Sequence, residues 1–303
     1  MKGIARFFTL YWIIYFPTCI AYNDLPGFSS VDEAMTVLLF VYTLWMYNNN
    51  RSINRRPWKE FMVCISLIAF YSVYSLLFGA NVSGAVWLDL MQEIRPYTII
   101  YCTWILNPRF TKKQKKWMLG TMVLTLFSWI AYHPQTLDTQ VEAEFPVLGQ
   151  LAICTGMSWY LFTKETKRNR NIALLLVLTG MLAPKFKFMG EVVCFIGFVY
   201  FVKNRLNFTS PKTIIYAVLL VTVILMVTWT RFDVSGLSND ELARPMTYKT
   251  SLRILWDYLP FGSGMGSFAC NGAWKFYSPL YYKYNLNGIW GLDEGGGFIC
   301  DAY

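Results

Sequence analysis

Arg244 and the glycine-rich stretch 262–266 are the residues whose types and spacing best suit binding of a phosphate group. An arginine guanidinium donates two parallel hydrogen bonds to two phosphate oxygens, which a lysine does less well. Gly262, Gly264 and Gly266 favour either a tight turn where the backbone meets a helix or a nest of backbone N–H groups facing an anion. The stretch does not follow a strand, so it is not a dinucleotide-binding fingerprint. We predict that these four residues bind a phosphate or pyrophosphate group.

Further ionisable residues lie within apolar segments or at their ends, where an unpaired charge costs at least about 2.5 kcal/mol. They are Asp89, Glu93, Arg95, Lys185, Lys187 and Glu191. In one interpretation, Arg95 or Lys187 pairs with one of the two glutamates simply to neutralise charge. In the other, Arg95, Lys185 and Lys187 line an outward-facing cationic pocket for an anionic substrate carried in the membrane.

Carboxylates that are candidates for a general base come late in the chain, at Asp293, Glu294 and Asp301. The seven cysteines are scattered and form neither a CxxC pair nor a Cys/His cluster, so the sequence predicts no metal site. No nucleotide-binding motif is present either, and we expect no cofactor. Cys270 and Cys300 both fall in the segment 231–303, which we expect to be exported, so a disulfide between them is considered, although spacing alone cannot establish its geometry.

Composition and the distribution of apolar residues predict a membrane protein that crosses the bilayer many times. Of the 303 residues, 55% are hydrophobic and 18% aromatic, and the mean hydropathy is +0.35. We expect an all-α bundle of about nine spans over 1–230, followed by a segment of helices and loops over 231–303. The expected spans are 5–22, 31–47, 60–79, 86–106, 117–133, 146–163, 171–184, 187–202 and 212–230. The sequence ends at Tyr303 without a closing apolar span, and we therefore expect the natural protein to be longer.

The loops between these spans alternate in charge, which predicts their orientation. Basic residues fill the loops after the second, fourth, sixth and eighth spans, and acidic residues without basic ones fill loops between them. Basic loops stay on the cytoplasmic side. The N-terminus is then cytoplasmic and 231–303 lies outside. The net charge of +9 follows from this arrangement, and we expect no nucleic-acid partner.

The segment 231–303 has its own helical pattern. Leu252, Leu255, Trp256 and Leu259 recur at helical spacing beyond Pro245, and such a stripe either lies along the membrane surface or packs on the spans. We expect Arg253 and Asp257 to form an ion pair on the flank of this helix. Four tyrosines follow, and they belong either to an interfacial aromatic belt or to a surface that stacks on sugar rings. They are Tyr277, Tyr281, Tyr282 and Tyr284.

Residues 244–268 resemble a motif of the O-antigen ligase and O-antigen polymerase superfamily. An arginine is followed by an amphipathic helix and then by Pro260-Phe-Gly-Ser-Gly-Met-Gly-Ser-Phe268, after many spans. The resemblance implies a glycosyltransferase of the bacterial inner membrane that takes a glycan from undecaprenyl pyrophosphate at the periplasmic face. Ligases transfer it to a lipid A–core sugar, and polymerases transfer it to another lipid-linked repeat unit. The acceptor is thus either a glycan or the lipid A–core.

The resemblance also implies roles for single residues. Arg244 matches the family's loop arginine, which engages the pyrophosphate, and Lys185 and Lys187 lie where members often carry a basic residue. Members commonly have a histidine after the glycine motif, but here the only histidine is His133. Asp301 occupies about that place and is therefore the expected base.

Two other functions remain open at this point. A transporter or flippase of lipid-linked sugars also needs a cationic cavity, although it predicts pseudo-symmetric halves that the sequence lacks. A different polyprenyl-phosphate-sugar transferase requires catalytic carboxylates in the first external loop, where Asp24, Asp32 and Glu33 lie.

Overall fold

The computed structural model describes residues 2–21, 30–49, 53–133, 145–182, 186–197 and 243–296, with single residues 199, 215, 218 and 222. All regular elements in these ranges are helices, so the all-α prediction is confirmed for the described part of the chain. The helices belong to two compact units, the first made of Met1–Met35 and Pro108–Arg231 and the second of Thr36–Asn107 and Phe232–Tyr303.

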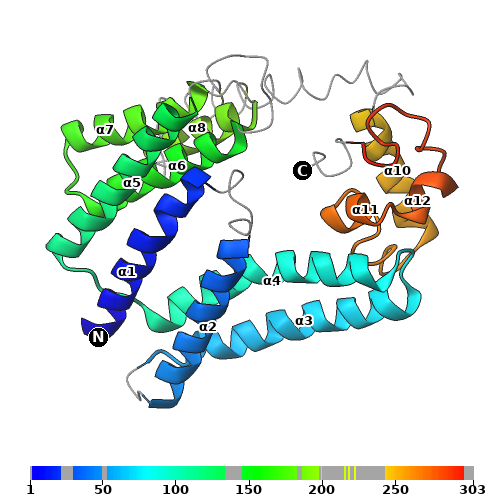
Figure 1. The fold of residues 1–303 in the computed structure, drawn as a ribbon, viewed down its shortest axis with the longest axis horizontal. Coiled ribbons are helices and arrows are strands. Elements are labelled where there is room, and N and C mark those ends of the chain that lie inside the picture. Colours follow the sequence, from blue (N-terminus) through cyan, green and yellow to red (C-terminus); the bar gives the residue numbers. More distant parts are fainter. Residues whose placement is uncertain are drawn as a thin grey trace. The chain divides into compact units, whose positions relative to one another are not determined.

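The first unit is a bundle of helices (Figure 1). Its elements are α1 (Lys2–Thr18), η1 (Cys19–Ala21), α5 (Lys112–Tyr132), α6 (Phe145–Phe162), α7 (Lys167–Leu178), η4 (Thr179–Leu182) and α8 (Phe186–Gly197). A core of large apolar side chains, centred on Trp129 of α5 and Phe188 of α8, holds the bundle together. Close approach of α6 and α7 depends on Gly156, because a Cβ there would lie 2.3 Å from a methyl group of Val177.

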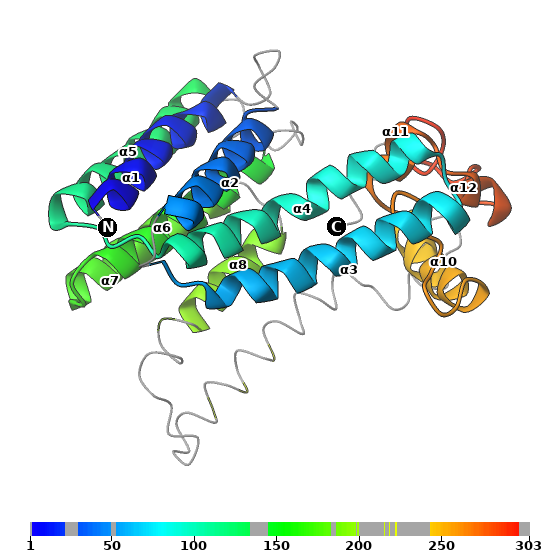
Figure 2. The same ribbon diagram turned by 90° about the horizontal axis from the view of Figure 1, so that it is seen from below.

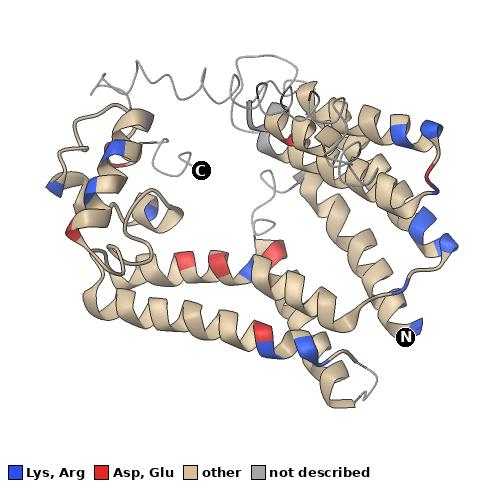
Figure 3. Cartoon of the chain, turned by 180° about the vertical axis from the view of Figure 1, so that it is seen from behind, with Lys and Arg blue, Asp and Glu red and all other residues tan. Residues whose placement is uncertain are grey.

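Among the described residues of this unit, the lysines and arginines of α1, α5, α7 and the turn after α6 gather at one end of its bundle (Figure 3). Helices α1 and α5 are parallel, because Phe8 stacks near Phe110 and Ile20 lies beside His133. Helix α6 is antiparallel to α5, with Phe162 beside Phe110. Consequently the basic start of α5, the turn after α6 and the start of α7 all lie at the end where α1 begins. This is the arrangement that alternating loop charges predict.

The second unit contains α2 (Val31–Asn49), α3 (Arg56–Phe78), α4 (Ser83–Leu106), α10 (Ala243–Asp257), α11 (Asn271–Lys275) and α12 (Pro279–Lys283). Helix α2 begins in the first unit and is antiparallel to α3, with Tyr47 near Trp58. Helices α3 and α4 form an antiparallel hairpin, and α10 to α12 gather at the end where its two helices are connected (Figure 2). Near the opposite end, Phe61 contacts Tyr101.

Only α3, among the described helices, is both long and apolar enough to cross a membrane, and Val147–Phe162 is a shorter apolar stretch. The others are shorter or less apolar, and α4 carries Asp89, Glu93 and Arg95. Helices overlap eight of the nine expected spans, while the ninth, 212–230, lies almost wholly outside the described residues. The expected seventh span, 171–184, is divided because α7 ends at Leu178 and a 3-10 turn follows.

Candidate functional site

The α3–α4 hairpin is the scaffold of the candidate site. Pro57 lies in the first turn of α3, where its missing N–H is no loss. Gly79 ends the helix, with its N–H donating to the carbonyl oxygen of Ser75. Residues 80–82 then turn the chain into α4. At this end of the hairpin, some backbone and side-chain polar groups have no hydrogen-bond partner within α3 or α4 themselves.

The glycine-rich stretch is hydrogen-bonded to this end of the hairpin. The Ala80 N–H donates to the Ser263 carbonyl oxygen (2.9 Å), and the Tyr74 hydroxyl donates to the Gly262 carbonyl oxygen (2.9 Å). The amide of Asn81 donates to the Gly266 carbonyl oxygen (2.6 Å). Side chains and backbone of the hairpin thus fix the stretch at several consecutive positions.

The glycines are required for this contact. Gly264 and Gly266 have φ values of +94° and +74°, which side chains disfavour. A Cβ on Gly264 would lie 2.9 Å from the Cα of Gly79, and one on Gly266 would lie 2.6 Å from the backbone of Ala85. Of the two interpretations of this stretch, the geometry supports the close approach of backbone to a helix. The Met265 N–H donates to Ser75 Oγ (2.7 Å), and the Gly262 N–H donates to the Tyr258 carbonyl oxygen (2.8 Å).

Asp89 of α4 joins the same region to α11. Its Oδ1 accepts a hydrogen bond from the Gly272 N–H at 2.9 Å. A Cβ on Gly272 would lie 2.6 Å from the Ala85 carbonyl oxygen, so this short helix also approaches α4 closely. One turn further along α4, the Gln92 amide oxygen accepts from Asn271 (3.0 Å). Asp89 is only 8% exposed, and its carboxylate is therefore a buried, hydrogen-bonded group.

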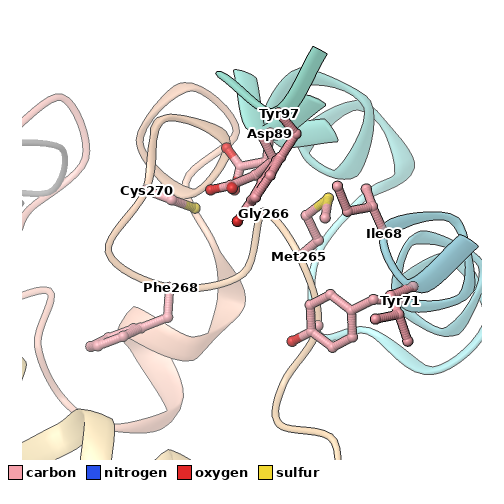
Figure 4. A pocket seen from close by; sticks show the side chains of 11 residues that line it. Ile68, Tyr71, Asp89, Tyr97, Met265, Gly266, Phe268 and Cys270 are labelled. Atoms are coloured by element: carbon pink, nitrogen blue, oxygen red, sulfur yellow. The ribbon is translucent and has the colours of Figure 1, made fainter. Parts of the chain in front are cut away.

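A pocket of about 390 Å³ opens between the hairpin and the glycine-rich stretch (Figure 4). Its walls come from three elements, namely α3, α4 and the chain between α10 and α11. The lining residues that argue for function are Tyr71, Asp89, Glu93, Tyr97, Phe268 and Cys270. Asp89, Glu93 and Tyr97 follow one another at four-residue spacing, which puts them on one face of α4.

The charges that line the pocket are acidic. Asp89 and Glu93 are its ionisable carboxyl groups, and no lysine or arginine is among the described lining residues. Glu93 and Arg95 are two residues apart on α4 and therefore do not face each other. The pairing of Arg95 or Lys187 with Glu93 or Glu191 stays a prediction.

The predicted phosphate-binding residues are distributed over both units. Arg244 is the second residue of α10. The preceding residue, Ala243, belongs to the same buried cluster as the pocket residue Cys270. Arg95 lies on α4 but does not line the pocket. Lys187 lies in α8 of the first unit, and the side chains of Arg244 and Lys187 are not among those described. Lys185 and Asp301 lie outside the described residues, and the roles of all five stay predictions.

Cys270 is a buried thiol that caps α11. Its Sγ accepts from the Ala273 N–H at 3.4 Å, and Cys300, its suggested disulfide partner, lies outside the described residues. Burial, reinforced by a hydrogen bond to Asp89, raises the pKa of Cys270 to about 12. This thiol is therefore protonated at neutral pH and acts as a packing and capping group.

Three of the four tyrosines in the C-terminal segment have structural roles. Tyr281 is fully buried, and its hydroxyl oxygen accepts from the Ala269 N–H (3.1 Å). The Tyr277 hydroxyl donates to the Leu292 carbonyl oxygen (3.0 Å), and burial raises the pKa of Tyr277 to about 12. Tyr284 donates to Asp257. Tyr282 is 54% exposed and is the one of the four that faces outward.

Helix α10 differs from the expectation in two respects. It begins at Ala243, so Pro245 lies in its first turn rather than before it. The expected ion pair between Arg253 and Asp257 is absent from the described residues, because Asp257 instead binds the Tyr284 hydroxyl. The stripe that contains Leu252, Leu255 and Trp256 is exposed, and Ile254 is the buried residue of that turn.

Sequence reasoning identified the glycine-rich stretch but not the pocket beside it. The four-residue spacing of Asp89, Glu93 and Tyr97 is the available signal, whereas the two interpretations of these charges concerned ion pairing or a cationic pocket. Tyr71 gave no signal, because one aromatic residue in an apolar segment resembles any other, whereas Phe268 was identified only as the last residue of the glycine motif. Comparisons of the chain with protein-family models, with curated proteins and with solved structures found no match.

Proposed function

We propose that the protein is a membrane glycosyltransferase that moves a glycan from undecaprenyl pyrophosphate to an acceptor sugar at the periplasmic face. The single observation that carries this proposal is the docking of the glycine-rich stretch onto the hairpin end that lies away from the basic start of α3. The motif that resembles the ligase and polymerase superfamily therefore forms one wall of a pocket at the side of the protein expected to be periplasmic.

Exposed apolar side chains along α3 support a location in the membrane. Val63, Leu67, Leu77 and Phe78 are each more than 60% exposed, which is costly in water over a contiguous surface. All charged residues of α3 lie in its first turns, and the helix is uncharged from Phe61 to Phe78 (Figure 3). The proposal includes about nine spans, a cytoplasmic N-terminus and a periplasmic segment 231–303.

In the proposed chemistry, cations bind the pyrophosphate and a carboxylate acts as the general base. Arg244, Arg95, Lys185 and Lys187 bind the pyrophosphate and stabilise the charge that develops as it leaves. Contacts of this kind typically contribute about 3 kcal/mol each in a site that excludes water. A carboxylate, for which Asp301 is the candidate, accepts the proton of the attacking sugar hydroxyl, and the anomeric carbon is inverted.

Replacing Arg244 in the organism that encodes the protein tests this proposal. We expect Arg244→Ala to lower the yield of transferred glycan about 100-fold, and Arg244→Lys to restore only part of it, because lysine cannot form the forked contact. Arg253→Ala is the matched control. Arg253 is exposed on the same helix, has no ion-pair partner among the described residues, and its loss should leave the glycan unchanged.

The lipid-linked glycans that accumulate distinguish the candidate activities. Single repeat units exposed on the periplasmic side indicate a polymerase, and long lipid-linked chains that never reach lipid A indicate a ligase. Units trapped on the cytoplasmic side indicate a flippase instead of an enzyme. An unchanged surface glycan in Arg244→Ala would overturn the proposed role of Arg244.

A further inference from the structure

The pocket between α3, α4 and the glycine-rich stretch has no role so far. We infer that it binds the acceptor, an uncharged saccharide, with Glu93 accepting a hydrogen bond from a sugar hydroxyl. The inference rests on the proposed transferase function, which names an acceptor sugar but no site for it. The inference gives the acceptor and the pyrophosphate different binding sites, whereas the sequence analysis predicted pyrophosphate binding at the glycine-rich stretch beside this pocket.

The acidic lining argues against pyrophosphate and in favour of hydroxyl groups. Two carboxylates in one pocket repel a phosphate group. Carboxylate oxygens only accept hydrogen bonds, and sugar hydroxyls donate them. A hydrogen bond to a charged acceptor is about twice as strong as one between neutral groups. The pocket therefore favours a ligand that offers donors and carries no negative charge.

The two carboxylates have different roles because their surroundings differ. Asp89 is buried and already accepts from the Gly272 N–H, so it holds α11 in place. Glu93 lies one turn deeper, is exposed, and has no hydrogen-bond or ion-pair partner among the described residues. It is the carboxylate with free acceptor capacity, and in an apolar helix pair an ionisable group of this kind is costly to maintain without a function.

The remaining walls suit a sugar ring. Tyr71, Tyr97 and Phe268 bring aromatic rings to the pocket, and Figure 4 shows the ring of Tyr71 across the pocket from Asp89. Aromatic surfaces pack on the apolar C–H faces of sugars while a few polar groups fix orientation. The volume of about 390 Å³ lies at the lower end of the range for small-molecule pockets, about 300–1,000 Å³.

Binding of simple methyl glycosides to the full-length protein in nanodiscs tests the inference. The probes are the methyl glycosides of glucose, galactose, mannose, rhamnose and N-acetylglucosamine, observed by saturation-transfer difference NMR. We expect at least one to bind, and Glu93→Gln to weaken that glycoside at least 10-fold, because the loss of a charged acceptor typically costs a factor of about 10 to 100. Ile68→Trp, which fills the pocket from α3 without removing a polar group, should also abolish binding.

Glu60→Gln is the matched control, because Glu60 is a carboxylate at the other end of α3, paired with Arg56 and outside the pocket. It should bind the glycosides like the unmodified protein. The inference is overturned if no glycoside binds, if Glu93→Gln binds as well as the parent, or if inorganic pyrophosphate displaces the glycoside. Failure of the transferase proposal is seen separately, as an unchanged surface glycan in Arg244→Ala, and leaves the glycoside result standing.

Discussion

At the scale of single residues, the glycines near the hairpin end act through two separate effects, conformation and space. Gly266 needs both, since its φ is +74° and a Cβ would meet the backbone of Ala85. Gly295 needs only the first, with a φ of +86° and open space around it. Gly288 has open space and no positive φ. Alanine at these three positions therefore separates the two effects.

We expect Gly266→Ala to lower the free energy of unfolding by about 2–5 kcal/mol, the sum of the left-handed conformation and a backbone clash. Gly295→Ala should lower it by about 1–2 kcal/mol, and Gly288→Ala should change it by less than about 0.5 kcal/mol. Thermal unfolding of the purified protein in detergent measures all three. Equal stability of the Gly266 and Gly295 variants would contradict the close contact with Ala85.

The raised pKa of Cys270 predicts an unreactive thiol. At pH 8 a thiol with an ordinary pKa of 9 is about one-tenth ionised, whereas a pKa of about 12 leaves about one molecule in ten thousand as thiolate. N-ethylmaleimide should therefore modify Cys270 about 1,000-fold more slowly in the folded protein than in dodecyl sulfate. Peptide mass spectrometry measures both rates, and an exposed Gly288→Cys is the internal reference. Rapid modification of folded Cys270 would show that the thiol is neither buried nor protonated.

At the scale of elements, α10 has an exposed apolar face that continues toward α3. Leu252, Leu255 and Trp256 are 63%, 51% and 75% exposed. Phe261, after the helix, contacts the rings of Phe70 and Tyr74 on α3. We therefore propose that this face of α10 lies at the membrane interface. Of the two placements that the stripe allows, the exposure favours the membrane surface over packing on the spans.

Spin labels on two faces of α10 test this placement. A label at Trp256→Cys should collide with dissolved oxygen more often than with a water-soluble nickel chelate, and a label at Arg253→Cys should show the reverse. The protein is reconstituted in liposomes, in a background where other reactive cysteines are replaced. Equal accessibility of both labels to the chelate would place the helix in water.

The sequence predicted the existence of the helices better than the residues at which they begin. Apolar runs identified α3, α4 and α5, but each helix begins three to five residues earlier than the corresponding run. Hydropathy detects the apolar part only, while the basic residues at the starts of α3 and α5 extend those helices at little cost. Thr111 caps α5 through a capping box with Gln114, which sets its start independently of hydropathy.

The pocket was not predictable, because it depends on contacts between residues far apart in the sequence. Met265 and Ser75 are 190 positions apart, and Gly272 and Asp89 are 183 apart. No local pattern states that the glycines meet α4. The same limit explains the wrong prediction at Asp257. Its carboxylate accepts a hydrogen bond from Tyr284, which is distant in sequence, instead of pairing with Arg253 on the same helix.

At the scale of the whole molecule, the proposed membrane topology predicts which residues are accessible from each side of the membrane. Asn54→Cys and Glu165→Cys lie beside basic helix ends, and Tyr282→Cys and Gly288→Cys lie in the exposed C-terminal segment. In intact cells, a membrane-impermeant thiol reagent should label the second pair at least 10-fold faster than the first. Permeabilisation should abolish the difference. Uniform labelling in intact cells would contradict the proposed orientation.

The long-range fastening of the glycine-rich stretch also has a consequence for biosynthesis. The α3–α4 hairpin leaves the ribosome well before residues 262–272 are made, so Asp89 and the polar groups of Ser75 and Asn81 remain without their final partners during that interval. At about 5–20 residues per second, the delay lasts roughly 10–40 seconds. A nascent chain that stops before residue 262 lacks the final partners of all three groups, and one that stops between 267 and 271 lacks only the Gly272 N–H that Asp89 accepts from.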